Sequence, residues 1–172
     1  MKDLVVVMGV AGSGKTTTGR ALAEAGGWPF IEADEHHSNA NRAKMTAGTP
    51  LTDDDRVDWV ASMSAAANAM DAPRVVLACS ALTDFVQTSL QTQCDRAVRF
   101  VWLDVPEDQL AGRIAGRGGH FMPVSLLESQ LAALTVPADA IRVDGMQVTT
   151  DLVLSVLQAL PRGPIGSGYL AP

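Results

Sequence analysis

The residues with the clearest chemical meaning form a glycine-rich stretch near the amino terminus. Gly9-Val10-Ala11-Gly12-Ser13-Gly14-Lys15-Thr16 fits the pattern G-x-x-x-x-G-K-[ST] at every position. Glycines let a backbone wrap closely around a phosphate with its N–H groups pointing inward, and a helix that begins behind the loop adds the positive end of its dipole. We therefore expect Lys15 to contact the β- and γ-phosphates of a nucleotide and the Thr16 hydroxyl to ligate Mg²⁺. The residues expected to bind the nucleotide are Gly9, Gly12, Ser13, Gly14, Lys15, Thr16 and Thr17.

Other proteins that bind nucleotides fit this stretch less well. The dinucleotide pattern G-x-G-x-x-G would place glycine at Thr17. No N-K-x-D motif follows to read guanine, and the chain is short for the core of a motor ATPase. A phosphate loop by itself does not separate these classes. The remaining features favour a kinase that acts on a small molecule.

Two carboxylates at the end of the second apolar run could serve an acceptor. Alternation along Glu32-Ala33-Asp34 would point both to the same side of the carboxyl edge of a sheet, where open α/β sheets bind ligands. We expect Asp34 to accept the proton of an attacking hydroxyl and Glu32 to contact Mg²⁺ through water. A solvated strand end is the alternative.

Strand and helix signals alternate regularly along the chain, which favours a parallel sheet covered by helices on both faces. We predict a P-loop NTPase-type three-layer α/β sandwich with a five-stranded parallel sheet and a mobile lid, similar to the nucleoside monophosphate kinases. It is one domain over 1–160, with the lid at about 113–124 and a flexible tail at 161–172. The strands are expected at 4–8, 29–32, 75–79, 98–103 and 141–143. The helices are expected at 14–25, 39–47, 53–70, 85–93, 106–116, 125–134 and 148–160.

Composition limits the partners. The chain has 172 residues with a formal net charge of −6, and 5% of them are aromatic, so a track for nucleic acid is not expected. Cys79 and Cys94 form no CxxC pair, which suits two thiols in a reducing compartment. The apolar run from Leu4 to Val10 resembles a signal peptide core, but Asp3 lies where positive charge belongs. No run approaches the roughly 20 apolar residues of a membrane span, so we expect a cytoplasmic protein.

Beyond the phosphate loop, motifs spread over most of the chain resemble those of the bacterial-type gluconokinase family. The resemblance rests on order and spacing, and K-M-x-x-G-x-P-L-x-D-x-D-R and C-S-A-L are specific to that family among small kinases. It implies phosphorylation of D-gluconate at its terminal hydroxyl by ATP with Mg²⁺, in a cytoplasmic and usually dimeric enzyme. The matching segments are GVAGSGKT, Glu32 to His37, Asn41, Lys44-Met45, Gly48, Pro50-Leu51, Asp53 to Arg56, Trp59, Cys79 to Leu82 and Gly119 to Phe121.

The resemblance also implies roles for individual residues. Arg113 and Arg117 resemble lid arginines that bind the nucleotide, and Lys15, Asp34 and Arg117 are implied to be catalytic. The two arginines have a simpler alternative role, because a helix carboxyl terminus attracts cations for its own sake. Trp59, which also belongs to the family pattern, could be a core residue. Gluconate, a polyol with a carboxylate, needs cations and hydrogen-bonding groups. The implied substrate residues are Asp34, His37, Asn41, Lys44, Arg56, Ser80, His120 and Gln130.

The acceptor half departs from the family pattern. The family writes D-G-D and L-H-P where this chain has Glu32, Ala33, His36 and Ser38, and it has Lys and Tyr-Arg-Asp where this chain has Thr83, Val86, Gln87 and Thr88. These changes remove cations that could contact an acid. Two alternatives therefore stay open: a kinase for another hydroxylated acceptor such as shikimate, and a nucleotide-binding protein that has lost catalysis. A nucleic-acid end kinase is disfavoured because it would need a basic channel.

Overall fold

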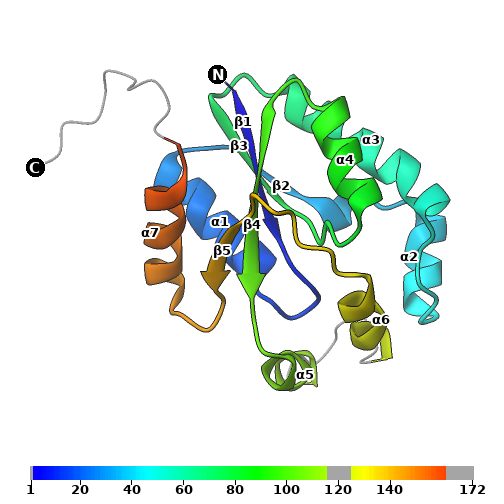
Figure 1. Ribbon diagram of the computed structural model, residues 1–172. Helices are drawn as coiled ribbons and strands as arrows, with labels where there is room; N and C mark the ends of the chain where they lie inside the picture. The colour runs from blue at the N-terminus through cyan, green and yellow to red at the C-terminus, as the bar shows by residue number, and fades with distance from the viewer. Residues whose placement is uncertain (1, 116–124, 162–172) are drawn as a thin grey trace, which may run out of the picture.

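The computed structural model describes residues 2–115 and 125–161 and confirms the α/β fold (Figure 1). Every predicted helix and strand is present, with bounds within one residue of those expected. The strands are β1 (Asp3–Met8), β2 (Phe30–Glu32), β3 (Arg74–Ala78), β4 (Ala97–Asp104) and β5 (Ile141–Asp144). The helices are α1 (Lys15–Gly26), α2 (Asn39–Thr46), α3 (Asp53–Ala69), α4 (Asp84–Gln93), α5 (Glu107–Ala115), α6 (Ser125–Ala133) and α7 (Thr149–Ala159).

The five strands form one sheet in the order β2-β3-β1-β4-β5, and every neighbouring pair is parallel. Alternate residues of the central strand β1 feed two separate cores. Leu4, Val6 and Met8 pack toward α3 and α4, whereas Val5 and Val7 pack toward α1 and α7. Figure 1 shows these two helix pairs on opposite faces of the sheet, with α2, α5 and α6 beyond the carboxyl ends of the strands. The loops at that end are therefore free to form a site.

One short element was not expected from the sequence. The strand β2 ends at Glu32, and a 3-10 helix, η1 (Ala33–His36), follows it directly. The prediction that strand alternation carries Asp34 to the sheet edge is wrong in its reason, because Asp34 belongs to this turn. The turn still brings Asp34 to the carboxyl end of the sheet, since it continues from β2 at that end.

Two properties of the described residues concern membrane insertion and thiol chemistry. None of the described helices is long and apolar enough to cross a membrane. Cys79 and Cys94 are both buried and unpaired, and burial raises the pKa of the Cys79 thiol to about 12. Neither thiol is suited to react, because the thiolate is the reactive form.

Candidate active site

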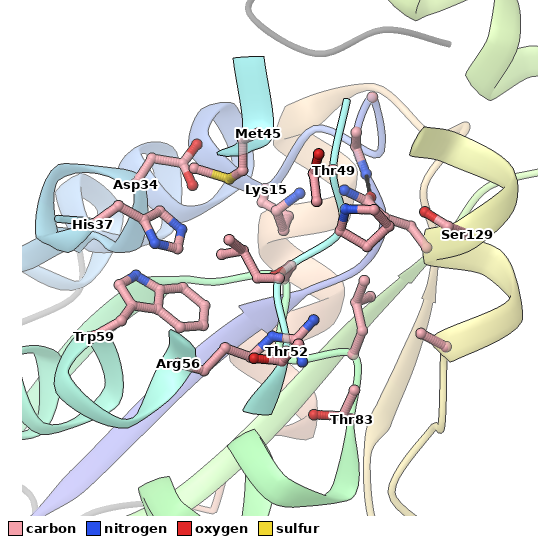
Figure 2. Close-up of a pocket in the computed structure, with 18 of the residues that line it drawn as sticks. Lys15, Asp34, His37, Met45, Thr49, Thr52, Arg56, Trp59, Thr83 and Ser129 are labelled. Atoms are coloured by element: carbon pink, nitrogen blue, oxygen red, sulfur yellow. Dashed lines mark hydrogen bonds between the residues drawn. The ribbon is translucent and has the colours of Figure 1, made fainter. Parts of the chain in front are cut away.

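A cavity of about 650 Å³ opens at the carboxyl ends of β1, β2 and β3, within the size range of small-molecule sites (Figure 2). Its wall combines the phosphate loop, η1, the segment that joins α2 to α3, the start of α3, the loop after β3, and one face of α6. These regions come from several separate stretches of the chain between residues 11 and 133, so the cavity depends on the tertiary fold.

The phosphate loop has the backbone geometry that its glycines permit. Gly9 has φ +148°, and a Cβ there would lie 2.8 Å from the Ser13 hydroxyl oxygen. Gly12 has φ +81°, and a Cβ there would lie 3.1 Å from an Ile114 side-chain carbon. The ammonium group of Lys15 donates to the Val10 carbonyl oxygen at 3.0 Å, across the loop. Gly12, Gly14, Lys15 and Thr16 line the cavity, while Gly9 and the buried Ser13 lie outside its lining.

Two oxygen groups suited to Mg²⁺ meet beside the phosphate loop. The Thr16 hydroxyl donates to a Glu32 carboxylate oxygen at 2.7 Å. Burial raises the pKa of Glu32, and the bond from Thr16 opposes that rise. Magnesium is held by hard oxygens, often one or two protein groups plus the phosphates of a substrate, so this pair fits the ion. Glu32 itself lines a smaller neighbouring hollow rather than the main cavity.

Asp34 and an aromatic pair form one side of the acceptor part. Asp34 and His37 both line the cavity, and the His37 ring stacks on Trp59 with centroids 4.4 Å apart. The Trp59 indole N–H donates to the Ala33 carbonyl oxygen at 2.7 Å, which ties α3 to η1. Trp59 is thus both a core residue, 4% exposed, and part of the cavity wall. Burial lowers the pKa of His37, so its ring is neutral at pH 7.

Arg56 lies on another side of the cavity. Figure 2 shows it near Thr52 and Thr83, apart from Asp34. Its guanidinium donates to an Asp53 carboxylate oxygen at 2.8 Å, and both side chains line the cavity. Among the residues that the structure describes, Lys15 and Arg56 are the cations in this lining. An anionic group of an acceptor would find its positive partner at Arg56, because Lys15 belongs to the phosphate loop.

The loop after β3 carries a strained residue next to the cavity. Ala81 has φ +45°, which is uncommon for a residue with a Cβ, while its neighbours Ser80 and Leu82 line the cavity. The Gln87 amide group donates to the Ala81 carbonyl oxygen at 2.8 Å and to the Thr135 carbonyl oxygen at 2.7 Å. In the sequence, Gln87 stands among the positions where the family pattern has cations that this chain lacks. In the fold it holds this turn and links it to the chain that follows α6.

Gln130 joins the phosphate loop to α6. Its amide oxygen accepts a hydrogen bond from the Ala11 N–H at 2.7 Å, and its side chain lines the cavity beside Ser129. The sequence predicted a substrate contact for Gln130. The structure places it at the boundary between the nucleotide and acceptor parts.

Some predicted site residues lie outside the cavity lining. Asn41 and Lys44 are bonded to Asp55 of α3. Thr17 is exposed on α1, and the Arg113 guanidinium donates to the Gly12 carbonyl oxygen at 3.4 Å and to the Gly145 carbonyl oxygen at 3.2 Å. Arg113 therefore lies beside the phosphate loop. Arg117 and His120, with most of the expected lid, lie outside the described residues.

The main omission of the sequence prediction is the segment between α2 and α3. Thr49, Pro50, Leu51 and Thr52 all line the cavity, as does Met45 at the end of α2. Gly48, Pro50 and Leu51 belong to a motif that carried the family resemblance, but no role was assigned to them. Their position between two helices of the acceptor half was the available signal.

Comparisons with known proteins agree with this geometry. The sequence model of the AAA domain family matches residues 4–137. A gluconokinase of Gluconobacter oxydans is 44% identical over 158 residues, covering 89% of this chain and 88% of that protein. The crystal structure of a gluconokinase from Sinorhizobium meliloti has a TM-score of 0.80 at 42% identity, covering 91% of this chain and 90% of that one. A shikimate kinase from Aquifex aeolicus, with a TM-score of 0.62 at 15% identity over 90% and 94% of the two chains, shares the fold.

Proposed function

Because the chain belongs to the gluconokinase family of P-loop kinases, we propose that it transfers the γ-phosphoryl group of ATP to D-gluconate. The products are ADP and 6-phosphogluconate. The observation that carries this proposal is the shared cavity, in which the phosphate loop, the carboxylate Asp34 and the cation Arg56 line one space. A loop that can hold the phosphoryl donor, a carboxylate that can accept a proton and a cation that can pair with an acidic substrate thus line one site.

The reaction is an in-line displacement. The terminal hydroxyl oxygen of gluconate attacks the γ-phosphorus, and the bond from that phosphorus to the oxygen it shares with the β-phosphate breaks. Asp34 accepts the hydroxyl proton, which requires hydrogen-bond reach. Lys15 offsets the charge of the β- and γ-phosphates, together with the backbone N–H groups of the phosphate loop. When bound at Thr16 and Glu32, Mg²⁺ supplies further positive charge for the phosphates.

The cavity suits a polyol acid in a defined orientation. We assign the carboxylate of gluconate to Arg56, on the side away from Asp34. The carbon chain then lies along the wall formed by the stacked His37 and Trp59 rings and by Leu51. Ser80 and Gln130 offer hydrogen-bonding groups to the hydroxyls. This orientation directs the terminal hydroxyl toward Asp34 and the phosphate loop.

The remaining roles continue the family resemblance. Arg113 and Arg117 are proposed to contact the nucleotide, and Arg117 to stabilise the transferring group. His120 is proposed to contact gluconate. We also propose a single kinase domain over 1–160, a homodimer and a cytoplasmic location; the tail expected at 161–172 lies, after Pro161, outside the described residues. The two unpaired cysteines are consistent with a reducing compartment. Light scattering after gel filtration tests the dimer.

An acceptor screen tests the proposal. The purified chain is incubated with ATP, Mg²⁺ and one acceptor at a time, and ADP release is coupled to NADH oxidation. Gluconate should give the highest kcat/KM, above glucitol, gulonate and shikimate. Turnover with another acceptor and none with gluconate would overturn the substrate and keep the kinase. ATP binding with no turnover on any acceptor would indicate a protein that has lost catalysis.

A further inference from the structure

The segment between α2 and α3 is a loop whose two ends are held together by hydrogen bonds. Thr49, Pro50, Leu51 and Thr52 line the cavity, so this loop forms one wall of the acceptor part. At its first end, the Thr49 N–H donates to the Lys44 carbonyl oxygen at 2.9 Å, and Gly48 turns with φ +73°. At its second end, Thr52 is the N-cap residue of α3. The loop is therefore anchored by the last turn of one helix and the first turn of the next.

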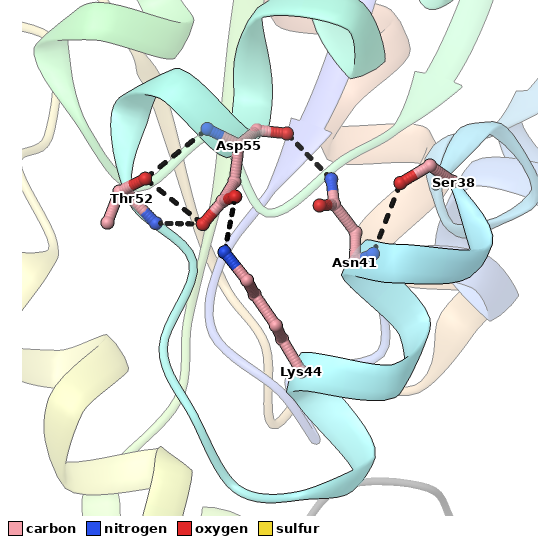
Figure 3. A network of polar contacts seen from close by, with 5 residues as sticks. All are labelled: Ser38, Asn41, Lys44, Thr52 and Asp55. Atoms are coloured by element: carbon pink, nitrogen blue, oxygen red, sulfur yellow. Dashed lines mark hydrogen bonds and ion pairs between the residues drawn. The ribbon is translucent and has the colours of Figure 1, made fainter.

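Asp55 connects these two ends (Figure 3). One of its carboxylate oxygens accepts from the Lys44 ammonium at 2.6 Å. The other accepts from the Thr52 N–H at 3.0 Å, completing the capping box of α3. The bond from Lys44 is the main cause that lowers the pKa of Asp55 to about 2. The Asp55 carboxyl is therefore ionised at neutral pH.

Asn41 adds a second tie between the same helices. Its amide group donates to the Asp55 carbonyl oxygen at 2.6 Å, and its own N–H donates to the Ser38 hydroxyl, which caps α2. Asn41 is 5% exposed. Lys44, Asn41 and Asp55 together form a clasp, which joins the two ends of the loop and lies outside the cavity lining.

We propose that Lys44 is a positioning residue that acts through Asp55, and that this clasp sets the affinity for the acceptor by holding the 49–52 wall in place. The inference rests on the proposed function for its choice of acceptor. It gives Lys44 and Asn41 a role different from the substrate contact that the resemblance implied. The ammonium group that a substrate carboxylate would need is already bonded to a carboxylate at 2.6 Å.

The location of the pair separates a local role from a general one. The Lys44 side chain is 45% exposed and the Asp55 side chain 16%, so the pair lies near the surface, where ion pairs contribute little to global stability. Loop position, in contrast, responds strongly to the loss of a tie, and small displacements of a site wall reduce productive binding. Removal of the pair should therefore change the acceptor site more than the melting temperature.

The first test measures the loop itself and does not depend on the identity of the acceptor. In Lys44→Met and in Asp55→Asn, amide hydrogen exchange over 47–52 should be at least about threefold faster than in the parent, with unchanged exchange in β1 and β3. Lys2→Met is the control for loss of a surface lysine, because Lys2 forms an ion pair with Asp71 at 3.1 Å away from the cavity, and that pair is more exposed than the Lys44–Asp55 pair. Unchanged exchange over 47–52 in both variants would overturn the clasp.

The second test uses steady-state kinetics. Lys44→Met should raise KM for gluconate about tenfold while kcat and KM for ATP stay within about twofold, and Lys44→Arg should restore most of the affinity. In the double variant Lys44→Met/Asp55→Asn, KM for gluconate should be no higher than in the more affected single variant, because both substitutions remove the same Lys44–Asp55 ion pair. Additive losses would instead mean that Lys44 contacts the substrate directly, and would overturn the proposal. If gluconate is not an acceptor, the hydrogen-exchange result still stands, and only the proposed function is contradicted.

Discussion

The nucleotide side and the acceptor side of the cavity are built by different means. On the nucleotide side, eight consecutive residues form the binding loop, and their backbone conformation provides most of the donors. On the acceptor side, the wall comes from η1, the 49–52 loop, α3, the turn after β3 and α6, and each part is held by side-chain bonds to another. The first side depends on local geometry, and the second depends on tertiary ties.

This difference has a consequence for substitutions. A change in the phosphate loop should affect mainly the nucleotide, because backbone conformation sets most of the geometry of that loop. A change on the acceptor side can act at a distance, because Asp55, Gln87 and Trp59 hold parts of the wall that they do not belong to. Substitutions on one side at a time show whether the two sides can be altered separately.

The largest effect is expected from Asp34→Asn. The amide cannot accept the hydroxyl proton, and general base catalysis typically contributes 10² to 10⁴ in rate, so kcat should fall by about that factor. ATP binding, followed by titration calorimetry, should be unchanged because Asp34 lies outside the phosphate loop. A variant that keeps more than a tenth of the parent kcat would remove Asp34 from the mechanism.

Gly9→Ala should damage the nucleotide side selectively. The new Cβ would be strained at φ +148° and would lie 2.8 Å from the Ser13 hydroxyl oxygen. Strain of about 1–3 kcal/mol at the loop corresponds to a loss of ATP affinity of up to about 100-fold. Calorimetric titration with ATP measures it. Gly27→Ala, at another glycine with positive φ but with open space around it, is the control and should leave ATP affinity unchanged.

Arg56→Gln should weaken the acceptor side alone. Loss of a charged hydrogen bond to the gluconate carboxylate should raise KM for gluconate about 10- to 30-fold, with KM for ATP unchanged. The variant should also discriminate less between gluconate and uncharged glucitol, because the lost contact is the one that reads the carboxylate. Equal losses for both acceptors would place the carboxylate elsewhere.

The smallest effect concerns His37 and pH. Burial lowers its pKa below the ordinary value of 6.5, so the unfolded chain takes up this proton before the native one does. The free energy of unfolding should therefore decrease as pH falls below about 6.5, by less than about 1.4 kcal/mol for each pH unit. Urea unfolding at several pH values should show a smaller decrease in His37→Phe, which keeps a ring to stack on Trp59. An identical slope in His37→Phe would contradict this assignment.

The same contrast explains what could be predicted from the sequence. Apolar runs, glycines and acidic helix starts are local signals, and they predicted the five strands, the helices and the phosphate loop. The 3-10 turn at Ala33–His36 was missed because the sequence pattern polar-apolar-polar over three residues does not distinguish the end of a strand from a short turn that follows it. Residue type alone could not reveal that Lys44 pairs with Asp55, 11 positions away. Nor could it show that Gln87 reaches Thr135 rather than a ligand.

The most direct test of the account is the identity of the product. With ATP, Mg²⁺ and gluconate, phosphorus and proton magnetic resonance should show one new phosphate ester, on the terminal carbon, in a one-to-one ratio with ADP. That result would support both the assignment of Asp34 to the attacking hydroxyl and the orientation set by Arg56. A phosphate on another carbon, or ATP consumption without any phosphorylated acid, would contradict it.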